Sequence, residues 1–373
     1  MQSLDNNTQA FLALVRAGLW EKDVRLLPYQ DIKWLEVYRL ASEQSVLGLV
    51  LAGLEHSDIK PPKESLLQWI GETQQIEQRN KAMNQFIADL IAKMREADIY
   101  TLLVKGQGIA QCYERPLWRA CGDVDLFLSA DNYQKAINYL LPLSSSHDEE
   151  LEGEKHYSLS INDWVVEIHG SLPSRISPKA DRVLEEIQRC VFYNGSVSSW
   201  RDGQTVVFLL HPNENVVYVF THILKHFFRG GIGLRQICDW CRLIWVNHNT
   251  IDEKLLMKRL KEMGFVSEWK VFASLAVDML GMPADSMPFY SPSRQWREKA
   301  NSVLNYIMTV GNFGHNRDNS FRTKQPFLKR KWIAFSYKIK DFFCHFKVFK
   351  LDSLKVFIME VKSGVVYTLR HEG

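Results

Sequence analysis

Apolar positions recur every three or four residues through the first hundred positions of the chain. One such run covers residues 35–51 and a second covers residues 66–90, with Pro61-Pro62 between them. This spacing is typical of one face of an α-helix. We therefore expect an N-terminal helical region over residues 1–98, with a helix that begins just beyond the two prolines.

The pattern changes at residue 99 to short apolar runs that are typical of strands. Residues 99–104 (IYTLLV) form one run, which ends in the turn Lys105-Gly106-Gln107-Gly108 ahead of a short helical pattern. Residues 124–128 form a second run. Two further runs, 155–161 and 164–168, are joined by Asn162-Asp163, a pair suited to a tight hairpin turn.

From residue 204 to about residue 307 the helical period returns. The sequence therefore predicts an α+β fold in which a small mixed sheet is flanked by N-terminal and C-terminal helical regions. We place the α/β core at residues 99–200, a C-terminal helical domain at 201–320 and a tail at 321–373. The N-terminal helices either form an independent unit or pack on the core.

Composition narrows the class of protein. With 373 residues, 46% of them hydrophobic and 24% charged, fibrous and small disulfide-stapled proteins are excluded. Six cysteines without regular spacing are typical of reduced thiols, and the first twenty residues lack the features of a signal peptide. No apolar run approaches the roughly 20 residues of a membrane span. We expect a cytoplasmic protein.

The formal net charge of +3 hides an uneven distribution. The tail at 321–373 carries 12 Lys or Arg against 4 Asp or Glu, and it interleaves these cations with aromatic residues. Such a segment can make a peripheral contact with an anionic membrane surface, which would make the protein membrane-associated, or it can bind nucleic acid. Alternatively, it packs its rings on the domain and exposes its lysines. The near-neutral total argues against nucleic acid as a partner.

The candidate chemistry begins at Asp123-Val124-Asp125. In a strand, side chains two positions apart project from the same face, so both carboxylates can meet one cation, and the apolar residues between them face the core. Glu167 places a third carboxylate in another apolar run. Gly106, at a strand-to-helix turn, lets the backbone approach a phosphate closely. Oxygen ligands and backbone donors together suit Mg²⁺ and a triphosphate.

These residues resemble a known family. The segment Lys105-Gly106, Arg119 and Gly122-Asp123-Val124-Asp125-Leu126 is similar to the bacterial uncharacterised nucleotidyltransferases of the polymerase-β-like superfamily. Residues 164–169 resemble that group's third-carboxylate strand, in which His169 follows the acidic residue by two positions. The resemblance covers residues 30–310 and includes a later helical segment with His222, His226, Arg235 and Asp239. The chain departs from the superfamily at Gln107, where Ser or Gly is usual, and at Glu167, where many members have Asp.

The resemblance implies a Mg²⁺-dependent nucleotidyltransferase with a two-metal mechanism. A nucleoside triphosphate would be the donor, and the acceptor would be an unidentified small molecule, glycan intermediate or protein. Asp123, Asp125 and Glu167 would bind the metal, with Glu167 helping as general base. The nucleotide-binding set would be Lys105, Gly106, Gln107, Arg119 and Gly122. Substrate or interdomain contacts would come from His169, His222, Arg235 and Asp239.

Several simpler interpretations stay open. Arg235 and Asp239 stand at i and i+4, where an intrahelical ion pair is the plainest expectation. His222 and His226 have a spacing that can bind zinc, but the glutamate of the HExxH motif is absent. A catalytically weak nucleotide-binding or scaffold protein would explain Gln107. Polymerase or tRNA-modifying activity is a further alternative.

Overall fold

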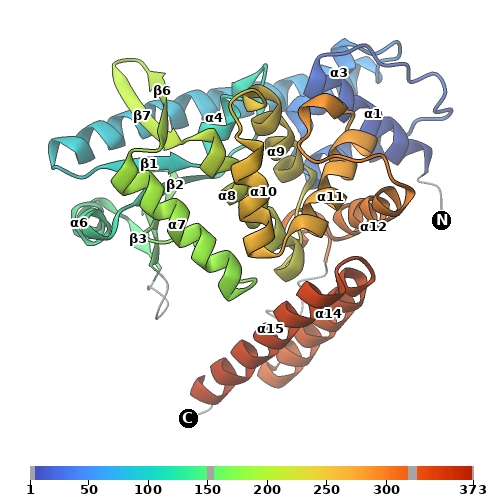
Figure 1. Ribbon diagram of the computed structural model, residues 1–373. Coiled ribbons are helices and arrows are strands. Elements are labelled where there is room, and N and C mark those ends of the chain that lie inside the picture. The colour runs from blue at the N-terminus through green and yellow to red at the C-terminus, as the bar shows by residue number, and fades with distance from the viewer. Residues whose placement is uncertain (1–4, 149–154, 318–325, 372–373) are drawn as a thin grey trace.

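The computed structural model describes residues 5–148, 155–317 and 326–371 (Figure 1). The chain has an α+β fold, in which one mixed sheet is flanked by N-terminal and C-terminal helices, as the sequence predicts. No helix among the described residues is long and apolar enough to cross a membrane.

The N-terminal region is helical, which confirms the periodicity of the first hundred residues. The long helix α4 begins directly after Pro61-Pro62. Helices α1 and α3 approach so closely that a Cβ at Gly53 would lie 2.1 Å from the carbonyl oxygen of Leu14. Glycine is therefore required at this crossing. The four helices are α1 (Asn6–Trp20), α2 (Trp34–Glu43), α3 (Leu47–Glu55) and α4 (Lys63–Glu96).

The strands described form one seven-stranded sheet in the order β3-β4-β5-β2-β1-β7-β6. Strand β2 lies near its middle, antiparallel to β1 and parallel to β5, while β1 is parallel to β7. The strands are β1 (Thr101–Val104), β2 (Asp123–Leu128), β3 (Ser146–His147), β4 (His156–Ile161), β5 (Trp164–His169), β6 (Val197–Asp202) and β7 (Thr205–Leu210).

The two faces of the sheet belong to different apolar clusters. Val124, Leu126 and Leu128 of β2 pack with residues of α4 and of α6 (Ala130–Leu140), as the alternation along this strand predicts. On the opposite face, Phe127 joins a larger cluster built by the helical regions. The polar residues of β2 lie on the same face as Phe127, so they project toward this larger cluster.

Along the sequence, the remaining helices lie between strands or follow the last strand. The α-helices are α5 (Gly106–Ala110), α7 (Pro178–Asn194), α8 (Pro212–Arg229), α9 (Leu234–Asn247), α10 (Glu253–Met263), α11 (Val266–Ser274), α12 (Arg294–Val310), α14 (Phe327–Val348) and α15 (Lys350–His371). Short 3₁₀ turns occur at Pro116–Trp118, Leu141–Leu143, Ala284–Ser286 and Asn312–Gly314, and Leu275–Met279 is π-helical.

The sequence-based boundary of the core at residue 200 is wrong, because it falls inside β6. Strand β7 pairs with β1, so the sheet continues to Leu210. The helical segment expected from residue 204 begins instead with α8, at Pro212. Residues 205–210 (TVVFLL) form a short apolar run, and periodicity alone does not separate such a strand from the start of a buried helix.

The N-terminal helices pack against the C-terminal helices. The indole Nε1 of Trp20 donates to the carbonyl oxygen of Leu280 at 2.6 Å, and Arg16 donates to the carbonyl oxygen of Met279 at 3.1 Å. Apolar residues of both regions belong to one buried cluster. Of the two arrangements that the sequence leaves open, the structure therefore has the N-terminal helices packed on the rest of the chain.

The described part of the tail is a pair of helices, α14 and α15, which lie side by side (Figure 1). His345 and Phe349 are buried against Phe227 of α8, whereas the side chains of Trp332 and Phe343 are exposed. Part of the aromatic content is thus used for packing. The membrane contact expected of this segment stays a prediction.

Candidate functional site

Lys105 and Asp125 form the centre of the site. Val104, the last residue of β1, lies opposite Asp125 of β2, so the next residue brings its ammonium Nζ to 2.6 Å from Asp125 Oδ1. Burial alone would raise the pKa of the Asp125 carboxyl, but the adjacent Lys105 charge holds it below its usual value. Lys105 adopts a positive φ of 57°, a strained conformation of the kind that concentrates at functional sites.

The glycine turn follows directly. Gly106 has a φ of 38°, and the five-residue helix α5 starts at this position. The side chain of Gln107 does not face the carboxylates: it is buried, and its amide donates to Asn80 Oδ1 of α4 at 2.7 Å. The Gln107 side chain is therefore not placed for a phosphate contact in this structure. Only the backbone N–H groups of this turn stay candidates for that role.

The three predicted carboxylates lie on the same face of adjacent strands. Glu167 of β5 is the register partner of Asp125, and Asp123 lies two residues before Asp125 on β2. Burial and the neighbouring Asp125 charge raise the pKa of Asp123. Hydrogen bonds from His156 and then from His169 lower the pKa of Glu167. The strand geometry expected for Asp123 and Asp125 is thus present.

Two histidines form hydrogen bonds to the carboxylates on this face. His169 Nε2 lies 2.8 Å from Asp125 Oδ1 and 3.5 Å from Glu167 Oε2. His156 of β4, the register partner of His169, places its Nε2 3.2 Å from the same Glu167 oxygen. The two rings stack with centroids 4.8 Å apart. Burial opposes protonation of His169, but its hydrogen bonds to Asp125 and Glu167 raise its pKa overall.

Arg119 is paired with Asp239, and both residues line the small cavity beside Asp123 and Asp125. Its Nε and Nη2 bind the two carboxylate oxygens of Asp239 on α9 at 3.0 and 2.6 Å, and both side chains are nearly inaccessible to solvent. Tyr113 donates a further hydrogen bond to Asp239 at 2.7 Å. In this structure the guanidinium of Arg119 thus forms an ion pair between the segment before β2 and helix α9, and its phosphate contact stays a prediction. Asp239 thereby connects α9 to the segment between α5 and β2.

Arg235 takes a different partner from the one that helical spacing suggests. Its Nη1 donates to the carbonyl oxygen of Ala120 at 2.7 Å, while Asp239 pairs with Arg119. The buried Nε of Arg235 has no hydrogen-bond partner among the described residues. This guanidinium lines a small cavity together with Asp123 and Asp125. It is therefore placed to meet a substrate group beside the carboxylates.

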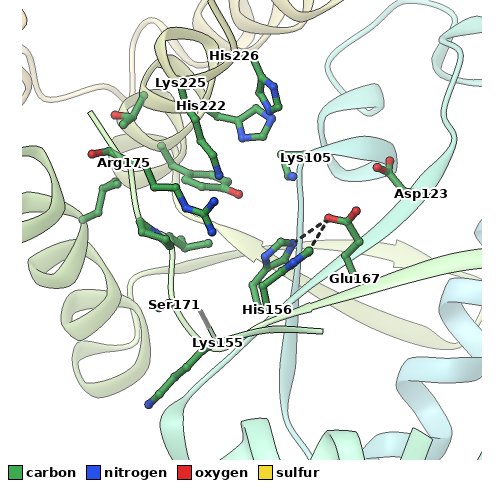
Figure 2. Close-up of a pocket in the computed structure, with 17 residues that line it drawn as sticks. Lys105, Asp123, Lys155, His156, Glu167, Ser171, Arg175, His222, Lys225 and His226 are labelled. Carbon is green, nitrogen blue, oxygen red and sulfur yellow. Dashed lines mark hydrogen bonds and ion pairs between the residues drawn. The ribbon is translucent and has the colours of Figure 1, made fainter. Parts of the chain in front are cut away.

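A cavity of about 420 Å³ opens in front of the carboxylate face. Figure 2 shows Asp123 and Glu167 on one side of it and Lys225 and Arg175 on the other, with Lys105 between. Burial and then the charge of Arg175 lower the pKa of Lys225 to about 8. His222 also lines the cavity, and burial followed by the Lys105 charge lowers its pKa. The cavity thus joins an acidic side to a basic side.

Comparison with protein families gives one match, to the family described as uncharacterised nucleotidyltransferase, over residues 30–281. The match spans more than half of the chain. This protein belongs to that family. The family name indicates a transferase that moves nucleotidyl groups. Searches of curated proteins and of solved structures found no match.

Several side chains in the site of this nucleotidyltransferase escaped the sequence analysis. His156 lies in a strand that the sequence predicts, but only its register with His169 brings it to Glu167. Arg175 lies in the segment after β5, and Lys225 stands between His222 and His226 on α8. Isolated basic residues carry no motif, so only the tertiary structure could place them at the cavity. Gly122 is exposed, and a Cβ at this position would have nothing within 4 Å.

Proposed function

We propose that this protein transfers a nucleotidyl group from a nucleoside triphosphate to an acceptor in a Mg²⁺-dependent reaction. The observation that carries this proposal is the placement of Asp123, Asp125 and Glu167 on one face of β2 and β5, beside a cavity with a basic far side. Oxygen ligands attract a hard cation, and the basic side attracts a polyphosphate. The family match supports the transferase class.

The donor set fits Mg²⁺ in its chemistry. Three carboxylates supply the oxygen ligands that Mg²⁺ prefers. Asp125 is paired with Lys105 and His169, and Glu167 is paired with His156 and His169. Asp123 and Asp125 would hold the ion, with Glu167 beside them. When bound, Mg²⁺ would neutralise charge that develops on the α-phosphate of the transferred nucleotidyl group.

The side chains of this chain supply the other roles. Lys225 and Arg175 would bind the phosphate chain through charge-assisted hydrogen bonds. Hydrogen bonds from its histidines keep Glu167 ionised at neutral pH, so it can accept a hydrogen bond from an acceptor hydroxyl and orient it. Arg235 would contact the substrate near Asp123. The proposed acceptors include a protein and a glycan intermediate.

The test is calorimetric titration of ATP, GTP, CTP and UTP, with and without Mg²⁺, into the full chain. We expect Mg²⁺-dependent binding of at least one nucleotide, weakened about tenfold or more by Asp123→Asn, since a charge-assisted contact is worth ~1.5–3 kcal/mol. Asp163→Asn, at the exposed turn between β4 and β5, is the matched control and should bind like the native chain.

A catalytically weak nucleotide-binding or scaffold protein is the second candidate. It is favoured by the ion pair between Lys105 and Asp125, which places a resident cation on a proposed metal ligand. Nucleotide binding that needs no Mg²⁺ and is unchanged in Asp123→Asn would support this alternative. Binding of no nucleotide by the folded native chain would overturn the proposed function.

A further inference from the structure

The carboxylate side of the cavity contains a second potential ligand set, built on nitrogen. Among the residues that the structure describes, one group of three candidate ligands has all its donor atoms within 4.8 Å of one another: His156, Glu167 and His169. Asp123 and Asp125 are not part of it. Glu167 is therefore shared between this group and the carboxylate set of the proposed function.

Two of the three separations within the group match those of ligands around one ion, and the third is within 4.8 Å. Zinc-type ions bind histidine nitrogen and carboxylate oxygen at about 2.0–2.2 Å, so two such ligands in a tetrahedral shell lie roughly 3.3–3.5 Å apart. The observed distances from Glu167 Oε2 are 3.2 Å to His156 Nε2 and 3.5 Å to His169 Nε2. An ion placed between these atoms would take the place of the hydrogens through which both Nε2 atoms now bind Glu167, so both imidazoles would coordinate in their neutral form.

The surroundings also suit a metal ion that keeps an open coordination position. All three residues line the cavity, so a fourth position would face the space available to substrate. Pairing between β4 and β5 fixes the two histidines opposite one another, and a bound ion would replace the hydrogen bond of 2.8 Å between His169 Nε2 and Asp125 Oδ1.

We propose that His156, Glu167 and His169 form a binding site for a divalent transition-metal ion of the zinc type. Two imidazole nitrogens and one carboxylate favour such an ion over Mg²⁺, which prefers oxygen ligands and gives up its water reluctantly. The proposal does not depend on nucleotide transfer. It gives the cavity a metal selectivity that the predicted set of three carboxylates would not provide.

The test uses Co²⁺ alone as a spectroscopic probe, added to the chelator-treated chain without nucleotide. We expect visible absorption bands characteristic of bound Co²⁺ with nitrogen ligands, resistant to excess Mg²⁺. His156→Ala should weaken Co²⁺ binding by at least about tenfold, since even indirect disturbance of a metal site costs 10–100-fold. His147→Ala, on the neighbouring strand β3 and exposed, should bind like the native chain.

Equal Co²⁺ affinity of the native chain and His156→Ala, or no binding by the native chain, would overturn the metal site. A second experiment uses the unaltered protein, so it does not depend on whether the variant folds. Zn²⁺ added to ¹⁵N-histidine-labelled protein should shift the Nε2 signals of two imidazoles. Unshifted signals would overturn it equally. Because these experiments contain no nucleotide, their failure is distinct from failure of Mg²⁺-dependent nucleotide binding.

Discussion

At the scale of single residues, substitution of Arg119 distinguishes a structural role of this side chain from a substrate-binding role. Replacing it with Met would leave the buried Asp239 carboxylate without its bidentate partner. We expect a loss of about 3–5 kcal/mol in the free energy of unfolding, measured by urea denaturation, because removing one member of a buried ion pair leaves an uncompensated charge. The double variant Arg119→Met/Asp239→Leu should lose less than the sum of the single losses.

The same variants test the prediction from sequence that Arg119 contacts phosphate. Nucleotide affinity of folded Arg119→Met should match that of the native chain, because the guanidinium is occupied by Asp239. An affinity loss of tenfold or more in protein shown to be folded would support the phosphate role and contradict a purely structural one.

Lys225 makes substrate binding depend on pH. Its pKa of about 8 means that the ammonium loses its proton as the pH rises through that value, and positive charge leaves the basic side of the cavity. Arg175, Lys105 and Arg229 supply the neighbouring positive charge, and Glu167 the negative. Affinity for ATP should fall about tenfold between pH 7 and 9.5, since a hydrogen bond to a charged group is worth ~1.5–3 kcal/mol.

Calorimetry across this pH range gives the measurement, and Lys225→Arg is the control. Arginine stays protonated throughout, so this variant should lose most of the pH dependence while it still binds at pH 7. Identical pH profiles for the native chain and Lys225→Arg would show that another group titrates.

At the scale of elements, the close crossing of α1 and α3 depends on a residue without a side chain, Gly53. A Cβ at Gly53 would lie 2.1 Å from the carbonyl oxygen of Leu14, so the two helices would have to separate. We expect Gly53→Ala to reduce the free energy of unfolding by about 1–3 kcal/mol, the usual cost of overpacking. Urea denaturation of the full chain is the measurement.

Gly71 of α4 is the matched control, because a Cβ there would meet nothing within 4 Å. Gly71→Ala should stabilise the protein by about 0.5–1 kcal/mol, since alanine loses less conformational freedom in a helix. Equal effects of the two substitutions would mean that helix propensity, and not the close crossing, governs Gly53.

Local patterns predicted the elements near the carboxylates well. The alternation from Val124 to Leu128 set which side of β2 is apolar, and Pro61-Pro62 marked the start of α4. Such local patterns could not predict contacts between segments that are distant in the sequence. Arg119 meets Asp239 across 120 positions, and Gln107 turns away toward Asn80 on a helix 27 positions earlier. Neither partner has a spacing that periodicity could reveal.

At the scale of the whole molecule, a buried acidic pair lies where helix α15 meets α11. Glu268 of α11 and Asp352 of α15 are both buried, and Ser267 donates to Glu268 at 2.7 Å. Burial and then the Asp352 charge raise the pKa of Glu268 to about 7, while Lys355 contacts Asp352 from the other side at 3.0 Å. At low pH the shared proton allows the two carboxyl groups to stay in contact.

The sign of the resulting pH effect follows from proton binding. Between pH 4.5 and 7 the folded protein keeps the proton on Glu268, whereas the unfolded chain releases it, so stability falls as the pH rises through this window. Thermal unfolding should show the contribution of Glu268 as a fall in Tm across this range, and Glu268→Gln should flatten that fall because an amide does not titrate. Glu185→Gln, at an exposed position of α7, should keep the native pH profile. If Glu268→Gln follows the native profile instead, the proton that titrates in this window lies on another group.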